Sequence, residues 1–307
     1  IEFNLIGVCD GIAMAHQGMK FSLASRELIA DSVETMLSAH AFDACICIPN
    51  CDKIVPGMVM GALRCNIPTI FCSGGPMAVG KGRNGEALDL NSVFEAVAAC
   101  TAGKITEEEL HYVECHACPS AGSCSGMFTA NSMNCLCEVL GLALPGNGTL
   151  LALSEERKEF WRAAARRAVE MAKQGGPLPR DLITEAAIDN VFTCDMAMGG
   201  SSNTVLHTLA FAAEAGFEYD LKRIDEISRR TPNICKVAPS SRYHMHDVLR
   251  SGGIMTILAE INKIPGALNT NVPTVSGKTL GEQIEGLSTQ DPAVIRTLDN
   301  AYSKDGG

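Results

Sequence analysis

The chain has 307 residues, of which 46% are hydrophobic, 20% are charged and 5% are aromatic. This length and composition predict a soluble globular protein with one large or two ordinary domains, and they exclude a disordered or fibrous chain. No apolar run reaches the roughly 18 residues that a membrane span requires. The formal net charge of −10, without any block of Lys and Arg, argues against nucleic-acid binding. An anionic substrate would therefore need positive charge supplied locally.

Fourteen cysteines are many for a chain of this size. Disulfide frameworks belong mainly to short secreted chains, and the sequence shows no signal peptide, so we expect reduced thiols, metal ligands or core residues in the cytoplasm. The first residues, from Ile1, are typical of the interior of a folded chain, and the sequence stops at Gly307 without a terminal helix. We therefore expect the natural polypeptide to be truncated at both ends here.

The first elements alternate between helix and strand. We expect a helix over 23–40 that Ser22 can cap, a buried parallel strand at 44–48, a helix starting near Pro56, and a second strand at 68–72. This order predicts an α/β fold in which helices flank a parallel sheet. Ligands of such sheets bind beyond the carboxyl ends of the strands, so the loops between strand and helix are the ones to examine.

Most of the remaining chain is predicted to be helical. Helix caps and glycine stops indicate helices at 89–100, after the capping box Thr106–Glu109, and at 125–144, 155–173 and 202–215. From about Thr274 the periodicity fades. We therefore predict an α/β domain over 1–290 and the start of a linker over 291–307.

Three chemically different side chains follow the first predicted strand: Cys51, Asp52 and Lys53. A thiolate suits iron–sulfur or zinc, a carboxylate suits magnesium, and a lysine can bind anions or be covalently modified. Adjacent side chains diverge, so this loop can serve two different metals. The simpler interpretation, with Cys51 in the core and Asp52 as a helix cap, is favoured by residue statistics alone.

A second candidate ligand is Cys124, which follows a run of small residues and precedes a helix predicted to start near Ser125. The amino terminus of that helix would stabilise a thiolate. Cys115 and Cys118 form a C-x-x-C pair that could be zinc or redox ligands, although no second pair at zinc-finger spacing accompanies them. Four other cysteines are expected only to pack: Cys45, Cys47, Cys135 and Cys137.

Three further features leave alternatives open. Asp10 precedes a glycine, so its carboxylate can point into a cleft or simply form a turn. The segment 198–204 opens a helix and is either an anion seat or an ordinary cap. His244 and His246 are interpreted as residues of a solvated loop without a role.

Several long motifs resemble the dihydroxy-acid and sugar-acid dehydratase family, in its dihydroxy-acid branch. The resemblance spans nearly the whole chain, and two long motifs in the right order make it specific. They are Cys51-Asp52-Lys53-x-x-Pro56-Gly57 and the run from Gly122 to Met133, supported by Gly7–Met14 with Gly18-Met19, Ser25–Glu27, Leu144–Gly148 and Ser202–Val205. One departure is Ser120-Ala121, where relatives often have Gly-Cys, and we expect it to have little effect.

The resemblance implies the metal ligands. Cys51 and Cys124 match cysteines that ligate an iron–sulfur cluster, either [2Fe-2S] or [4Fe-4S], whose third cysteine would lie upstream of this chain. Asp10, Asp52 and Lys53 match the ligands of Mg²⁺, with the lysine as a carbamate that offers a hard oxygen. The last magnesium carboxylate and the serine base of the family belong to a carboxy-terminal, β-barrel-like domain, so no catalytic residue is assigned in this chain.

The implied activity is that of a hydro-lyase. It would convert 2,3-dihydroxyisovalerate and 2,3-dihydroxy-3-methylvalerate to 2-oxo acids, as in the biosynthesis of the branched-chain amino acids valine and isoleucine, with iron acting on the C3 hydroxyl and magnesium on the carboxylate and C2 oxygen. We expect a homodimer or homotetramer, and no activity from these 307 residues alone. One alternative is a sugar-acid dehydratase. A different class would be a non-catalytic zinc or iron–sulfur module that uses Cys115, Cys118 and Cys124.

Overall fold

The computed structural model describes residues 1–306 and is rich in helices. The helices are α1 (Asp10–Ala13), η1 (Gln17–Phe21), α2 (Ser22–Ala39), α3 (Ile54–Cys65), α4 (Leu90–Thr101), α5 (Glu107–Ala117), α6 (Thr129–Val139), α7 (Glu155–Gln174), α8 (Pro179–Leu182), α9 (Glu185–Met198), α10 (Asn203–Ala215), α11 (Leu221–Arg230), α12 (Met245–Arg250), α13 (Gly253–Ile261), α14 (Leu280–Ile284) and η2 (Leu298–Asn300). The strands are β1 (Cys45–Cys47), β2 (Thr69–Phe71), β3 (Gly80–Lys81) and β4 (Ala87–Leu88).

The predicted strand–loop–helix–strand unit is present. β1 and β2 pair in parallel, with Cys45 opposite Thr69 and Cys47 opposite Phe71, and α3 connects them. Two isolated parallel bridges lie outside these strands, between Phe71 and Ala143 and between Pro76 and Ser123. The α/β class is therefore confirmed, although the parallel sheet is smaller than the predicted sheet layers, and helices supply most of the core.

Helix α3 packs against α2 at very close range, and two glycines make this possible. A Cβ atom at Gly57 would lie 2.7 Å from the carbonyl oxygen of Arg26, and one at Gly61 would lie 2.6 Å from Cβ of Val33. Any larger residue at either position would push the helices apart. This packing fixes the start of α3, which directly follows the Cys51–Lys53 loop.

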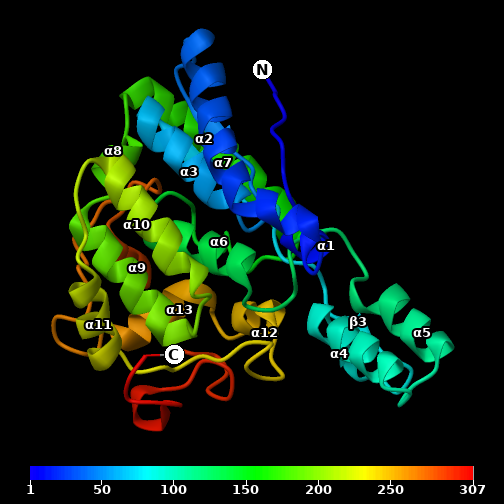
Figure 1. Ribbon diagram of the computed structural model, residues 1–307. Helices are drawn as coiled ribbons and strands as arrows, with labels where there is room; N and C mark the ends of the chain where they lie inside the picture. The colour runs from blue at the N-terminus through cyan, green and yellow to red at the C-terminus, as the bar shows by residue number, and fades with distance from the viewer. Residues whose placement is uncertain (307) are drawn as a thin grey trace.

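The centre of the molecule is built from helices that are buried on nearly every side. Figure 1 shows α6, α9 and α13 together in the body, below α2, α3 and α7. Almost every residue of α9 and α13 is buried. Because such helices have no polar stripe, the sequence pattern gives them no amphipathic signature. The predicted helix ends at Gly175 and Gly216 are confirmed, and both glycines have positive φ, 76° and 93°.

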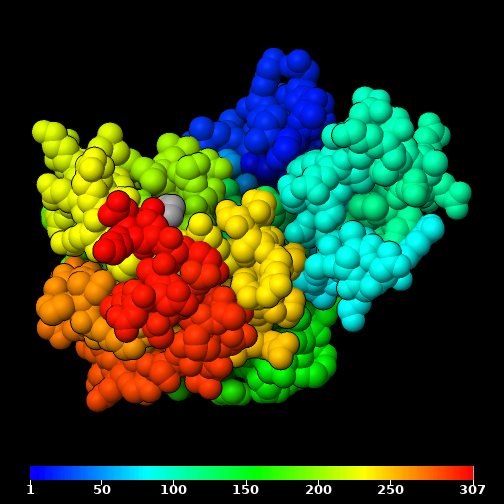
Figure 2. Space-filling view, turned by 90° about the horizontal axis from the view of Figure 1, so that it is seen from below, coloured from blue at the N-terminus to red at the C-terminus, as the bar shows by residue number. Residues whose placement is uncertain are grey.

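Residues 77–121 form an arm that extends from the body. It contains β3, β4, α4 and α5, which pack mainly on one another, and Figures 1 and 2 show it projecting to one side. The capping box Thr106–Glu109 is confirmed at the start of α5. A buried contact attaches the arm: Nε2 of His244 lies 3.0 Å from Oδ2 of Asp89. The prediction of a solvated loop is therefore wrong for His244, because its ring is enclosed between the arm and α12.

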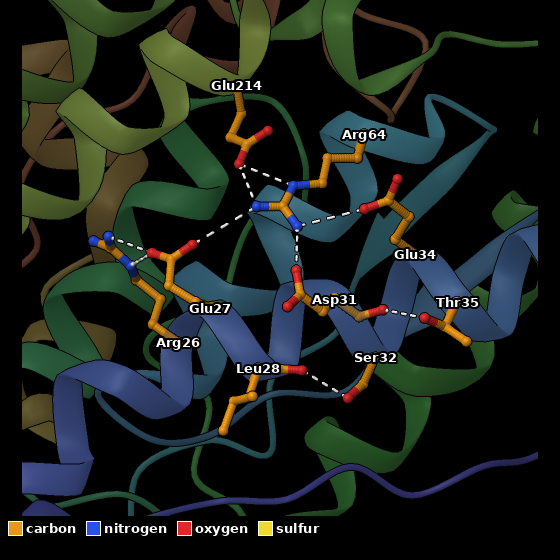
Figure 3. Close-up of polar contacts among 9 residues, drawn as sticks. All are labelled: Arg26, Glu27, Leu28, Asp31, Ser32, Glu34, Thr35, Arg64 and Glu214. Atoms are coloured by element: carbon orange, nitrogen blue, oxygen red, sulfur yellow. Dashed lines mark hydrogen bonds and ion pairs between the residues drawn. The ribbon is translucent and has the colours of Figure 1, made fainter.

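One arginine joins three helices. Arg64 of α3 contacts Asp31 of α2 and Glu214 of α10 at 2.7 Å each, and Figure 3 shows its guanidinium surrounded by carboxylates. These contacts raise the pKa of Arg64, chiefly through the hydrogen bonds to Glu214. The cluster holds α10 against the α2–α3 pair.

The segment from 291 to 306 lies on the body. Val294 and Ile295 are buried, the backbone N–H of Arg296 donates to Ile234 at 2.8 Å, and that of Tyr302 donates to Asn233 at 2.8 Å. Its role as a linker to a further domain stays a prediction. Among residues 1–306, no helix is long and apolar enough to cross a membrane.

Candidate metal centre

Asp10 and Lys53 meet in the interior, although they come from different segments. Nζ of Lys53 lies 2.8 Å from Oδ2 of Asp10, and both residues are buried. Oγ of Ser22 donates to the other oxygen, Oδ1 of Asp10, at 2.5 Å. The prediction that Ser22 caps α2 is therefore wrong: Ser22 is the first residue of that helix, and its hydroxyl is used to hold Asp10.

Asp52 completes an arrangement of two carboxylates around one ammonium. Its Oδ2 lies 4.0 Å from Nζ of Lys53. Burial raises the pKa of Asp52, the charge of Asp10 raises it further, and Lys53 and a hydrogen bond with Thr129 oppose this. Helix α3 has no side-chain cap, so the alternative of Asp52 as a helix cap is wrong. Two hard carboxylates near each other are a donor set that favours a cation.

The two predicted sulfur ligands lie close enough to Asp52 for its charge to act on both. Cys51 and Cys124 are both half-buried. Burial raises the pKa of the Cys51 thiol to about 11 and that of Cys124 to about 12, and the charge of Asp52 raises both further. The charges of Cys118, Cys51 and Cys9 raise the pKa of Cys124 as well. The structure thus brings both thiols and Asp52 into one neighbourhood, and Cys51 is not the buried core residue of the simpler interpretation.

The surroundings of Cys124 differ from the prediction. Helix α6 starts only at Thr129, because the preceding loop is held elsewhere: the backbone N–H of Met127 donates to Ala238 at 2.8 Å. Asn131 also holds the loop, donating from Nδ2 to the carbonyl oxygen of Gly126 at 2.6 Å. Cys124 therefore lies before the first turn of α6, and because burial raises its pKa, the prediction that a helix amino terminus stabilises its thiolate is wrong.

A polar cluster beside Asp52 was not assigned from the sequence. Oγ1 of Thr129 lies 2.8 Å from Oγ of Ser201 and accepts from Nδ2 of Asn203 at 3.0 Å. Behind them, Thr204 donates to Oδ2 of Asp195 at 2.5 Å. The sequence signal for this cluster is the polar run 201–204 at the start of a helix, for which an anion seat and an ordinary cap are the two interpretations. Its use as an anion seat stays a prediction.

Cys115 and Cys118 are exposed at the end of α5 on the arm. Within residues 1–306, no three His, Cys, Asp or Glu side chains are arranged to hold a metal ion. This applies to the C-x-x-C pair and to the Cys51 neighbourhood alike. Three surface hollows include none of the candidate ligands: one is lined by residues within 259–287, one by residues within 43–46 and 165–173, and one by residues within 209–219. The structure therefore gathers the predicted ligands without presenting them in coordination geometry.

Residues 1–283 match the family model described as "Dihydroxy-acid/6-phosphogluconate dehydratase N-terminal". The chain belongs to this dehydratase family. It is 78% identical over 307 residues to the dihydroxy-acid dehydratase of Akkermansia muciniphila and 60% identical over 307 residues to that of Aquifex aeolicus. In both comparisons the whole of this chain aligns with 55% of the relative. The chain thus spans about half the length of these curated dehydratases, and the resemblance read from its motifs is confirmed.

Proposed function

We propose that the protein acts as a dihydroxy-acid dehydratase, a hydro-lyase that removes water from a 2,3-dihydroxy carboxylate and yields a 2-oxo acid. The observation that carries this proposal is the meeting of Asp10, Asp52 and Lys53 next to the thiols of Cys51 and Cys124. Hard and soft donors at one place suit a reaction in which two unlike metals share one small substrate. The names of the dehydratase relatives support the same activity.

The donor chemistry fits the cofactors that the family resemblance implies. We propose that Cys51 and Cys124 hold an iron–sulfur cluster and that Asp10, Asp52 and a carbamylated Lys53 hold Mg²⁺. When bound, the cluster would act as a Lewis acid on the departing hydroxyl, and Mg²⁺ would neutralise the carboxylate and acidify the neighbouring C–H. Because burial raises the pKa of both thiols, a bound cation would have to displace their protons for them to act as ligands.

The chain's own hydrogen bonds orient these carboxylates. Ser22 holds one oxygen of Asp10, and Thr129 holds Asp52. Thr129 is in turn fixed by Ser201 and Asn203. Outer partners of this kind set the direction in which a carboxylate offers its free lone pairs. These contacts limit how far the two carboxylates can turn, although the donors are not yet arranged around a cation.

We also propose a cytoplasmic location, a homodimeric or homotetrameric assembly, and a place in the biosynthesis of branched-chain amino acids. All fourteen cysteines are free, which suits a reducing compartment. Three apolar side chains near the amino terminus, Ile12, Phe21 and Leu28, are 78%, 68% and 54% exposed. Such exposure on α1, η1 and α2 favours contact with another subunit.

The experiment that tests the proposed function is an anaerobic assay of the full-length protein. Formation of 2-oxo acid is measured from 2,3-dihydroxyisovalerate, gluconate and 6-phosphogluconate under identical conditions. We expect turnover of the dihydroxy acid to exceed that of both sugar acids. Preference for gluconate or 6-phosphogluconate would assign the protein to the sugar-acid branch, and absence of all three activities in protein loaded with iron and magnesium would refute the proposal.

A further inference from the structure

Cys115 and His111 meet on the surface of the arm, outside the candidate metal centre. Sγ of Cys115 lies 3.6 Å from Nε2 of His111. Both residues belong to α5, which Figure 1 shows on the arm that projects from the body. Residues four apart lie on the same face of a helix, so the backbone of α5 places the two side chains together. The proposed dehydratase centre uses neither of them.

The pair is open to solvent and the helix beneath it is held in place. Cys115 is exposed, and the side chain of His111 is 76% exposed, so a hydrated cation can reach both donors. The capping box of Thr106 and Glu109 fixes the first turn of α5, and the helix packs on α4, β3 and β4. A cation that binds here therefore orders side chains only, because the backbone is already ordered.

Glu114 favours one tautomer of His111. Its Oε2 lies 3.6 Å from Nδ1 of the ring. The negative charge of this carboxylate favours the proton of a neutral imidazole on Nδ1, which leaves the lone pair on Nε2, the nitrogen nearer to the thiol. A histidine that binds a metal through one nitrogen commonly directs its other N–H towards a carboxylate. Glu114, His111 and Cys115 follow this order.

The separation of the two donors suits a shared zinc ion. Zn–S bonds of about 2.3 Å and Zn–N bonds of about 2.0–2.1 Å, at a tetrahedral angle, place sulfur and nitrogen about 3.6 Å apart. The distance between Sγ of Cys115 and Nε2 of His111 agrees with this value. Thiolate and imidazole are preferred ligands of zinc, whereas magnesium and calcium prefer oxygen. A cation of the zinc type therefore fits without movement of the helix.

The charge of α5 also favours a cation. The helix contains no Lys or Arg, and its glutamates are Glu107, Glu108, Glu109 and Glu114. Glu107 and Glu108 lie one turn before His111, on the same side of the helix. The cation nearest to this face is Arg83, whose guanidinium lies over the ring of Tyr112 at 4.4 Å from its centroid. The glutamates outnumber it, so the local charge is negative.

The C-x-x-C pair is not the chelate that the structure favours. Cys118 lies beyond the last residue of α5, and its φ and ψ of −120° and 76° are not helical, so helical spacing does not place it beside Cys115. Within residues 1–306, no third His, Cys, Asp or Glu joins Cys115 and His111 in a group that could hold a metal ion. The remaining positions of a tetrahedral ion would therefore belong to water.

We propose that Cys115 and His111 bind one Zn²⁺ ion on the surface of the arm, with Glu114 as the outer partner of the imidazole. On binding, the thiol of Cys115 releases its proton to solvent. The ion then forms one bond to Sγ and one to Nε2, and water ligands leave to make room for them. No electron is transferred. This site is separate from the proposed dehydratase centre and does not depend on the proposed function.

The test uses reduced full-length protein and Co²⁺ as a spectroscopic substitute for Zn²⁺. The charge-transfer band between thiolate and cobalt reports sulfur ligation, and displacement by Zn²⁺ gives the affinity. Cobalt bound by other cysteines contributes equally to wild type and variants, so the difference spectra isolate this site. We expect His111→Ala and Cys115→Ser each to remove the same part of the band. Glu114→Gln should lower the affinity by about ten-fold or more.

Cys118→Ser and His116→Ala are the matched controls, because they change an exposed cysteine and an exposed histidine next to the pair. We expect both to keep the band and the affinity of wild type. Loss of the band in Cys118→Ser with a full band in His111→Ala would assign the metal to the C-x-x-C pair and overturn the proposal. An unchanged band in Cys115→Ser would overturn it as well. Alanine favours helix, so folded His111→Ala protein is expected, and circular dichroism checks this.

Discussion

Lys53 and Asp10 form a buried ion pair with a 2.8 Å contact across a sequence separation of 43 residues. The pair joins the loop before α3 to the short helix α1. Because both partners are buried, each depends on the other for compensation of its charge. This pair is the structural link between the amino-terminal segment and the Cys51–Lys53 loop.

Asp10→Asn should destabilise the metal-free protein by about 1–3 kcal/mol, because it removes the nearer of the two carboxylates around the buried Lys53 charge and leaves only Asp52, at 4.0 Å, to compensate it. Urea unfolding at neutral pH measures the change. Asp43→Asn is the matched control, since Asp43 is exposed, and it should stay within about 0.5 kcal/mol of wild type. Equal effects of the two substitutions would show that the Lys53–Asp10 pair contributes nothing specific.

Lys53→Arg tests the lysine separately from its charge. Arginine keeps the positive charge beside Asp10 but cannot form the carbamate that the magnesium site is proposed to use. We expect the variant to fold and to lose the dependence of turnover on magnesium, together with most of the turnover. An unchanged magnesium titration in the anaerobic assay would refute the role of Lys53 as a ligand.

Asp195→Asn should change how stability depends on pH. Burial raises the pKa of Asp195 from 3.8 to about 7, so between these values the folded state binds more protons than the unfolded state. Stability must then fall as pH rises through this range, by at most about 1.4 kcal/mol per pH unit. Asn keeps an acceptor for Thr204 and does not ionise. Urea unfolding from pH 5 to pH 8 should give a flatter curve for the variant.

Burial also raises the pKa of the Glu138 carboxyl, to about 7. This group provides the internal reference for the experiment. It adds the same kind of pH dependence to wild type and variant, so it cancels when the two curves are subtracted. The difference curve should shift in favour of the variant from pH 5 to about pH 7 and level off above that. Parallel curves for the two proteins would contradict the burial of an ionising Asp195.

His244→Phe should loosen the arm without unfolding the body. The substitution removes the hydrogen bond between His244 and Asp89, the residue that caps the start of α4. This hydrogen bond lowers the pKa of the Asp89 carboxyl. Hydrogen exchange measured by mass spectrometry should become about ten-fold faster in α4 and α5 and stay unchanged in α9. His246→Gln, on the neighbouring half-buried histidine, is the control. Equal protection of the arm in both variants would show that His244 does not anchor it.

The sequence predicted what local patterns encode. The capping box at Thr106 and the two short strands follow from residues a few positions apart, and the Cys51–Lys53 triplet is contiguous. Contacts between distant segments were out of reach: His244 and Asp89 are separated by 155 residues. Ser22 stands at a position in the sequence that is typical of a helix cap, but its hydroxyl donates to Asp10, a tertiary contact.

The sequence predicts which residues are candidate ligands of the site, but it does not predict how they are arranged or which side chains hold them. Nothing in the sequence indicates that Thr129 binds Asp52 or that Arg26 reaches His207. The late start of α6 has a similar cause, since Ala238 binds the preceding loop from a remote part of the chain. Which side chains support a site depends on tertiary packing between distant segments, and this packing produces no periodic pattern in the sequence.

The central claim is that neighbouring positions in one loop serve two unlike metals. It is tested most directly by measuring iron, acid-labile sulfide and bound magnesium per chain in anaerobically purified full-length protein, with Cys51→Ser and Asp52→Asn compared with wild type. We predict that Cys51→Ser loses iron and sulfide while magnesium binding stays near wild type, and that Asp52→Asn keeps iron while its magnesium affinity falls about ten-fold or more. Joint loss of both metals in a folded Asp52→Asn protein, or full iron in Cys51→Ser, would contradict the account.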